Sequence, residues 1–155
     1  MRELDRIDLK ILDLLQKDGR LSMTELAQRV GLSATPCTER VRRMEREGVI
    51  TGYHARVDPH ALGRPLLVFV ELKLSAKSNE AFDRVKKELA YVPEVMECHL
   101  VSGDFDYLIK ARLAEMGDYR RLLGNILLKL PSATESRSYV VMEEVKESLY
   151  LPPEV

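Results

Sequence analysis

The stretch GLSATPCTERVRRMEREG, from Gly31 to Gly48, decides how the first part of this 155-residue chain folds. At about 100° per residue, Cys37, Val41 and Met44 share one helical face, so that face can pack against a core. The opposite face is mainly polar and carries the hydroxyl and guanidinium groups of Thr35, Thr38, Arg42, Arg43 and Arg46. The pattern therefore predicts an amphipathic helix with one apolar side and one cationic side.

Signals for a start and a stop bound this helix. Ser33 can act as the N-cap, which places Pro36 in the first turn, where its missing N–H costs little. Alternatively Thr35 is the cap and Pro36 takes the first helical position. Gly48 supplies the stop, because a glycine readily takes the left-handed conformation that ends many helices.

Two further helices are predicted before this stretch. Asp5 can cap the first, and the run Asp18-Gly19-Arg20 ends it. Ser22 and Glu25 have the spacing of a capping box, so a short second helix runs to about Val30. Helix, short helix, glycine turn and basic helix is the order of a helix-turn-helix motif, with a plain three-helix bundle as the alternative.

A helix-turn-helix would place the Gly31–Gly48 helix in the major groove of DNA. Arginine can then read guanine or hold a phosphate, and threonine can do either. The net charge is −1, so any DNA contact depends on a local patch rather than on bulk charge. A solvated helix face is the plainer alternative. The candidate contacts to double-stranded DNA are Ser33, Thr35, Pro36, Thr38, Arg40, Arg42, Arg43 and Arg46.

The apolar period changes in the second half of the chain. Leu66–Leu74 is apolar on both phases and predicts a buried strand. The pattern then predicts, in order, a helix opened by Ser78 or Asn79, strands at 95–101 and 106–112 joined by a hairpin turn, a helix from Met116 that Pro131 stops, and a strand at 134–142. This βαββαβ order is that of a ferredoxin-like domain.

The predicted architecture is therefore α+β, with an N-terminal helix-turn-helix domain and a C-terminal βαββαβ domain. Alternating apolar residues at 50–57 suggest a short strand or hairpin, as in a winged helix. The segment from Asp58 to Pro65 is rich in turn residues and marks the boundary. We assign residues 1–63 to DNA binding and residues 64–155 to effector binding and oligomerisation.

One face of the predicted sheet stays uncovered, because two helices can cover only the other. Leu67 and Phe69 lie on the opposite phase to Val68, Val70 and Leu72, so the uncovered face is too apolar to leave in water. Pairing with the sheet of a second subunit is the simplest way to bury it. Coverage by the tail at 143–155 is the alternative.

Enzymatic chemistry finds no support in the sequence. No nucleophile–base pairing, metal-ligand spacing or phosphate loop occurs, so we predict no catalytic residue, no metal site and no cofactor. Cys37 and Cys98 both lie in apolar patterns, as expected of buried free thiols in a reducing compartment. No apolar run of about 18 residues occurs, and the N-terminus does not have the pattern of a signal peptide. We expect a soluble cytoplasmic protein that does not contact membranes.

The whole chain resembles the Lrp/AsnC, or feast/famine, family of transcriptional regulators, and within it the leucine-responsive branch. The resemblance extends over both predicted domains in the expected order. It is carried by the blocks LDRIDLKILDLLQKDGR, LAQRVGLS, TPCTERVRRMEREG, LVFVE, ECHLVSGDFDYL, YRRLLG and YVVMEEVKES.

The resemblance implies a homodimer through the βαββαβ domain, assembled further into an octamer, that binds partly palindromic promoter DNA. It also implies a response to a small amino acid such as leucine, held between subunits near the turn after the second strand. A glycine turn with carboxylates and backbone N–H groups would suit such a zwitterion. The residues implied are Leu100, Gly103, Asp104, Phe105, Asp106, Tyr139, Val140 and Val141. The alternatives are an architectural protein that bends DNA with little sequence preference, and an amino-acid sensor that acts on a protein partner.

Overall fold

Each of the helices near the N-terminus is preceded by a residue type that is favoured at the N-cap. The helices are α1 (Arg6–Lys17), α2 (Met23–Val30) and α3 (Ala34–Arg46). Asp5 caps α1, and Ser22 and Glu25 form the predicted capping box at the start of α2. Gly31 ends α2 with a φ of 76°, in the left-handed region that favours glycine. Ser33 is the N-cap residue of α3, as expected, although its side chain makes no capping hydrogen bond.

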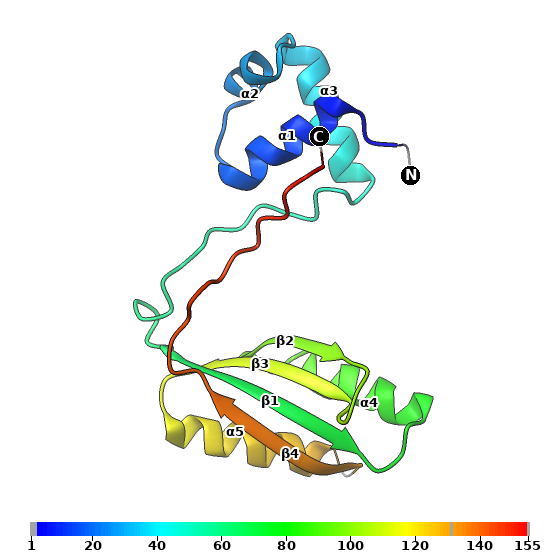
Figure 1. The fold of residues 1–155 in the computed structure, drawn as a ribbon, viewed down its shortest axis with the longest axis vertical. Coiled ribbons are helices and arrows are strands. Elements are labelled where there is room, and N and C mark those ends of the chain that lie inside the picture. The colour runs from blue at the N-terminus through cyan, green and yellow to red at the C-terminus, as the bar shows by residue number, and fades with distance from the viewer. Residues whose placement is uncertain (1–2, 131, 155) are drawn as a thin grey trace. The chain divides into compact units, whose positions relative to one another are not determined.

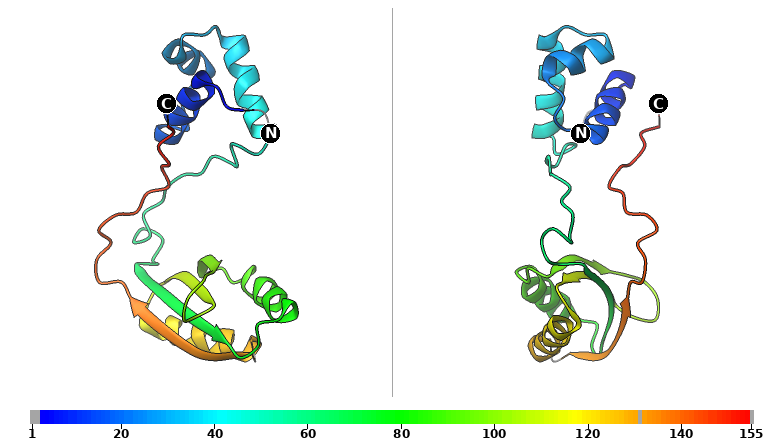
Figure 2. Two further views of the ribbon diagram at one scale, coloured as in Figure 1. Left: turned by 45° about the vertical axis from the view of Figure 1, so that its right-hand side comes forward. Right: turned by 90° about the vertical axis from the view of Figure 1, so that its left-hand side faces the viewer.

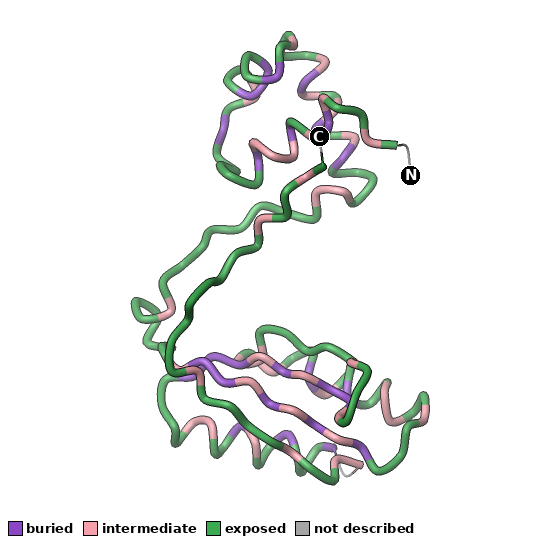
Figure 3. The backbone as a smooth tube through the Cα atoms, viewed as in Figure 1, coloured by how far each residue is buried: buried purple, intermediate pink, exposed green. Residues whose placement is uncertain are grey.

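A single apolar cluster holds these three helices together. Cys37, Val41 and Met44 form the buried face of α3, as predicted from their spacing. They pack with residues of α1 that include Ile11 and Leu15. Figure 3 marks the buried parts of all three helices. The predicted helix-turn-helix order is confirmed.

The strand or hairpin predicted at residues 50–57 is wrong. This segment leaves α3 in an irregular conformation and is exposed from Thr51 onward. A strand needs a neighbour that accepts and donates backbone hydrogen bonds, and within the described residues no strand pairs with this segment. Alternating apolar residues were therefore not sufficient evidence for a strand here.

A four-stranded antiparallel sheet with two helices forms the second part of the chain (Figure 1). The strands lie side by side in the order β2-β3-β1-β4. The elements in chain order are β1 (Leu66–Leu74), α4 (Asn79–Leu89), β2 (Val95–Leu100), β3 (Tyr107–Leu113), α5 (Met116–Lys129) and β4 (Ala133–Val140). This confirms the βαββαβ order, although β3 begins one residue later and β4 ends two residues earlier than predicted. The stop predicted at residue 131 lies outside the described residues.

Both helices of this part lie on one side of the sheet (Figure 2). Val68, Val70 and Leu72 of β1 face them and form a core with residues of α4 and α5 such as Val85 and Ile126. Cys98, which was expected to be buried, is exposed because it lies on β2, a strand at the edge of the sheet.

The opposite face of the sheet, called here the open face, contains both apolar and charged side chains. By strand register Phe69 lies between Lys110 of β3 and Tyr139 of β4. Tyr139 is 49% exposed. At one end of this face Arg112 Nη2 lies 2.6 Å from Glu144 Oε2, so the start of the tail covers that end.

The computed structural model describes residues 3–130 and 132–154, and the chain divides into two compact units. The first runs to Arg56 and also includes the tail from Lys146 onward, and the second spans Val57–Val145. The tail thus returns to the helical unit instead of covering the whole open face. The assignment of roles to residues 1–63 and 64–155 stays a prediction. Among the described residues, no helix is both long and apolar enough to cross a membrane.

Candidate nucleic-acid interface and effector site

The outward face of α3 presents the hydroxyl groups and two of the arginines that were singled out from the sequence. Ser33, Thr35, Arg42 and Arg46 are exposed, and Pro36 is half-buried. Thr38 is also half-buried, and its hydroxyl donates to the Ala34 carbonyl oxygen at 2.8 Å. This part of α3 has free cationic groups beside small hydroxyl side chains, which is the chemistry that contacts to phosphates and base edges require.

Arg40 and Arg43 lie elsewhere. The guanidinium of Arg40 is 2.6 Å from Asp5 Oδ2 and 2.8 Å from Asp8 Oδ1. That of Arg43 is 2.6 Å from Asp8 Oδ2, and its side chain is only 18% exposed. The sequence reasoning placed Arg43 on the outward face, but the structure directs it against α1. The physical reason is that the buried carboxylate of Asp8 requires cationic partners.

Asp8 is the centre of this charge cluster, which we define as Asp5, Asp8, Arg40 and Arg43. Its side chain is 1% exposed. Burial alone would raise the pKa of Asp8, but hydrogen bonds from Arg40 and Arg43 hold that pKa below its usual value. The cluster joins the first turn of α1 to the middle of α3 and so fixes how α3 is presented.

Sequence reasoning missed the role of Asp8. Its position three residues after the cap Asp5 identifies it as a capping-box partner, and both halves of that box are present. The remaining signal was the pair Arg40 and Arg43, which are three residues apart and share a helix face. Both signals are local to their helices, so neither shows that α1 and α3 meet at these residues.

The turn between β2 and β3, residues 101–106, contains a buried carboxylate. Asp106 is 4% exposed, and its Oδ2 accepts a hydrogen bond from the Leu74 amide at 2.8 Å. Its Oδ1 lies 2.9 Å from the ammonium of Lys77. Burial would raise the pKa of Asp106, but the Leu74 amide and Lys77 together lower it. Asp106 therefore ties the turn to the end of β1.

The other residues of this turn are less buried than Asp106. Gly103 has a φ of 135°, a conformation that favours glycine, and Asp104 is exposed. Phe105 is half-buried. Lys77, which the sequence reasoning did not select, is 63% exposed and adds a cation next to the turn. Acceptors, donors and opposite charges thus lie close together at this end of β1.

Tyr139, Val140 and Val141 lie beside the first half of β1, whereas the turn lies at its far end. Tyr139 pairs with Phe69, and the Val141 amide donates to the Leu67 carbonyl at 3.0 Å. The β2–β3 turn instead reaches Leu72 and Leu74. At about 3.4 Å per residue, the two groups are separated by roughly 10 to 24 Å along β1, with Tyr139 the nearest to the turn and Val141 the farthest. One chain therefore does not bring the two predicted halves of the effector site together.

The β2–β3 turn as a whole does not line either of two cavities found in the described part of the second unit. One, of about 460 Å³, lies among α4, α5 and the segment Leu62–Arg64. The other, of about 390 Å³, lies between α4 and β2 and has Leu100 in its wall. Of the predicted effector residues, only Leu100 lines either cavity. Within the described ranges, no group of three or more His, Cys, Asp or Glu side chains could hold a metal ion.

Comparison with known proteins matches a family to each of two parts of the chain. Residues 4–51 match the winged helix-turn-helix DNA-binding family, and residues 67–151 match the Lrp/AsnC ligand-binding domain. The chain belongs to the Lrp/AsnC family. It is 56% identical over 147 residues to the leucine-responsive regulatory proteins of Klebsiella pneumoniae and Escherichia coli K12, covering 95% of this chain and 90% of each relative.

Solved structures of this family have the same fold. A crystal structure of an AsnC family transcriptional regulator from Agrobacterium tumefaciens superposes with a TM-score of 0.90 at 35% identity, covering 96% of both chains. A transcriptional regulator of Neisseria meningitidis in complex with L-Met gives 0.89 at 31% identity, covering 97% of both chains. This Lrp/AsnC protein is therefore a transcriptional regulator with a DNA-binding unit and an amino-acid-binding unit, and not an enzyme.

Proposed function

We propose that this Lrp/AsnC regulator binds promoter DNA sequence-specifically through the outward face of α3, and that a small amino acid changes its assembly and its DNA binding. Leucine is our first candidate, because the 56% identical relatives are leucine-responsive. The observation that carries the effector part of the proposal is that Tyr139, Val140 and Val141 lie beside the first half of β1, whereas the β2–β3 turn lies at its far end. We also propose a cytoplasmic location, because a regulator of this kind must reach the DNA that it binds.

The proposed DNA surface consists of the exposed part of α3. Arg42 and Arg46 make no ion pair that would compete with DNA among the described residues. Arg40 and Arg43 then act mainly through the charge cluster, by holding α3 against α1. This separates the cationic residues of α3 into two that contact DNA and two that position the helix. The remaining proposed contacts are Ser33, Thr35, Pro36 and Thr38.

The proposed effector site lies between subunits. A zwitterionic amino acid needs acceptors for its ammonium group and donors for its carboxylate. The exposed carboxylate of Asp104 supplies the first, and Lys77 with the amides around Gly103 supplies the second. Tyr139, Val140 and Val141 supply the apolar wall, but only from another copy of the chain, because their own turn is too far away. Binding at such a shared site couples directly to assembly.

We propose a homodimer at least, formed through the open face, and an octamer built from such dimers. Phe69 and Tyr139 are apolar side chains on that face, and Lys110 and Glu71 provide charges of opposite sign. Two copies of this face can pack around a two-fold axis, since each then presents its apolar strip to the other. The symmetry predicts DNA half-sites separated by about one helical turn or a multiple of it.

DNA binding by the full-length chain, with and without L-leucine, tests this proposal. A duplex selected from a random pool should bind more tightly than an unselected duplex at one salt concentration, whereas equal binding would favour an architectural protein. Arg42→Ala and Arg46→Ala should each weaken binding by about 1–3 kcal/mol. Lys10→Ala removes one exposed cation on α1 and serves as the control. If both α3 variants bind like the parent, the proposed DNA surface is wrong.

Thermal unfolding in the presence of each amino acid tests the effector. A ligand at 100 times its dissociation constant should stabilise the native protein by about 2.7 kcal/mol. L-Leucine and L-methionine are the first two to compare, since relatives or structural neighbours are named for them. No stabilisation by any of the twenty amino acids would refute the effector part of the proposal while leaving the DNA surface standing.

A further inference from the structure

The C-terminal tail makes a defined contact with the outer face of α1. Gln16 donates from Nε2 to the Leu151 carbonyl oxygen and accepts the Leu151 amide at Oε1, both at 2.8 Å. The Tyr150 hydroxyl donates to Asp13 Oδ1 at 2.6 Å, and the ammonium of Lys17 lies 5.4 Å from the centre of the Tyr150 ring. A side-chain amide that satisfies both backbone groups of one residue holds that residue in a single register.

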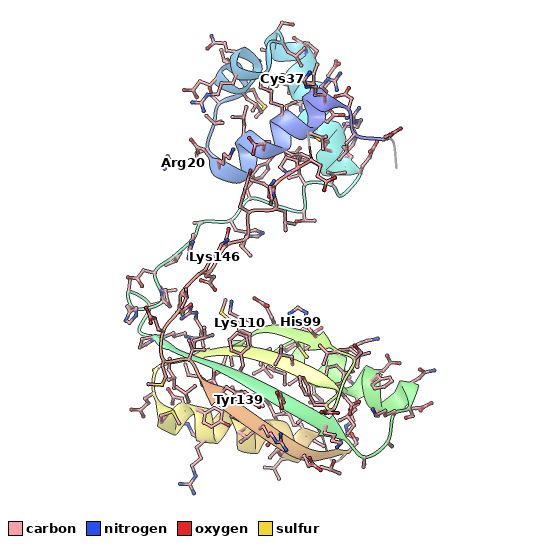
Figure 4. The ribbon with its side chains drawn as sticks, viewed as in Figure 1. Arg20, Cys37, His99, Lys110, Tyr139 and Lys146 are labelled. Atoms are coloured by element: carbon pink, nitrogen blue, oxygen red, sulfur yellow. The ribbon has the colours of Figure 1, made fainter. Side chains whose placement is uncertain are left out.

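A second anchor holds the start of the tail. Glu144 pairs with Arg112 of β3, a side chain that is only 8% exposed. Between the two anchors Val145 and Leu149 are 88% and 90% exposed, and Glu147 Oε2 lies 3.5 Å from the guanidinium of Arg56. Lys146, labelled in Figure 4, lies between the two anchors. The six peptide steps from Glu144 to Tyr150 can span no more than about 20 Å, so the two anchors are joined by a short piece of chain.

The upstream anchor directly follows proposed effector residues. Val141, whose amide donates to Leu67, is three residues before Glu144. A change at the end of β4 would therefore reach Glu144 through a short piece of chain.

The downstream anchor lies on the helix that positions α3. Asp13 and Gln16 lie on the outer side of α1, and Asp8 on its buried side contacts Arg40 and Arg43. Because a helix moves as a rigid element, a displacement of α1 at Asp13 and Gln16 also displaces Asp8. Since Asp8 contacts Arg40 and Arg43, it displaces α3 as well.

We propose that the tail, residues 141–151, is a strap that carries the effector signal from the end of β4 to α1 and so to the DNA-binding helix. The inference rests on the proposed function, because it needs an effector at the β4 end. The strap has two states, docked and undocked. Its contacts on α1 are few and lie near water, so each contributes little and undocking is readily reversible. An effector that binds the two states with different affinity shifts the population between them.

The double variant Gln16→Ala/Tyr150→Phe removes the downstream anchor without touching α3 or the β2–β3 turn. Glu144→Gln weakens the upstream anchor, and Lys146→Gln changes the same tail at a position with no anchor. Full-length proteins are compared for leucine affinity by calorimetry and for DNA affinity with and without L-leucine. Thermal unfolding checks that each variant is folded.

The strap predicts the same defect from both anchors. Each anchor variant should bind DNA and leucine as the parent does, but the factor by which leucine changes DNA affinity should fall toward one. The Lys146→Gln control should keep the parent's factor. A parental factor in both anchor variants overturns the strap. So does loss of leucine-free DNA binding, which would show that the contact only supports the fold of the DNA-binding unit.

Hydrogen exchange of the Leu151 amide separates failure of the strap from failure of the proposed function. This amide is protected when it donates to Gln16. If leucine stabilises the parent but does not change the exchange rate of the Leu151 amide, the strap proposal is wrong, whereas leucine is still supported as the effector. If leucine neither stabilises the parent nor alters DNA binding, the effector part of the proposed function is wrong, and the strap falls with it.

Discussion

The two units differ in where their charged and apolar side chains find partners. In the first unit the buried carboxylate of Asp8 finds its cationic partners, Arg40 and Arg43, within the same chain. In the second unit Phe69 and Tyr139 lie on a face that α4 and α5 leave open, and the proposed effector residues lie apart along β1. We therefore propose that the DNA-binding surface is complete in one chain, whereas the effector site requires another copy.

Removal of the carboxylate at Asp8 should have the largest effect. Asp8→Ala leaves two arginines against an apolar core without their shared partner, and we expect unfolding of the first unit to become easier by about 3 kcal/mol. Denaturant unfolding of the full-length chain, followed by helical signal, measures this. The control Glu39→Gln changes an exposed carboxylate on α3 and should shift stability by less than about 0.5 kcal/mol. Equal effects from the two variants would mean that the charge cluster does not hold α1 to α3.

A charge on the open face should have the next largest effect. Phe69→Lys places an ammonium at the centre of the proposed dimer contact, so the free energy of dimerisation should weaken by about 2 kcal/mol. Sedimentation at several protein concentrations measures the change, and Lys87→Gln at an exposed position of α4 is the control. A parent protein that stays monomeric at micromolar concentration would contradict the difference between the units that we propose.

The two aspartates of the β2–β3 turn should separate stability from ligand binding. Asp106→Asn loses the ion pair with Lys77 but keeps an acceptor for the Leu74 amide, so stability should fall by about 1 kcal/mol. Asp104→Asn alters an exposed side chain and should leave stability unchanged while it lowers leucine affinity. Thermal unfolding and calorimetry on the same samples measure both quantities. If Asp104→Asn binds leucine with the parent's affinity, the ammonium group of the bound amino acid does not contact Asp104.

Lowering the pH should cause the smallest of these changes, a loss of folding stability. The pKa values of Asp8 and Asp106 are lowered in the folded protein, so the unfolded chain binds more protons than the native chain below the usual value of about 4. The stability that these carboxylates contribute is present above that pH and is lost as pH falls through their lower native pKa values. Unfolding curves between about pH 5 and pH 2 should show a weaker decline for Asp8→Asn than for the parent. An identical decline in both would mean that Asp8 does not titrate as a paired carboxylate.

Much of the fold could be predicted because its signals are local. The caps at Asp5 and Ser22, the glycine at 31 and the apolar face of Cys37, Val41 and Met44 all act within a few residues. The apolar run at Leu66–Leu74 likewise marked a central strand to the residue. The strand expected at residues 50–57 failed because strand formation depends on a partner elsewhere in the chain.

By itself, then, the sequence determined the helix-turn-helix and the βαββαβ order, since periodicity, capping and turn chemistry are properties of short segments. The family followed from the resemblance of whole sequence blocks. Only the tertiary structure decided that Arg43 turns to Asp8, that Asp106 is held by Leu74 and Lys77, and that the tail returns to Gln16. Those contacts join residues at least 29 positions apart in the printed sequence. Their partners depend on how whole elements pack, which no local pattern records.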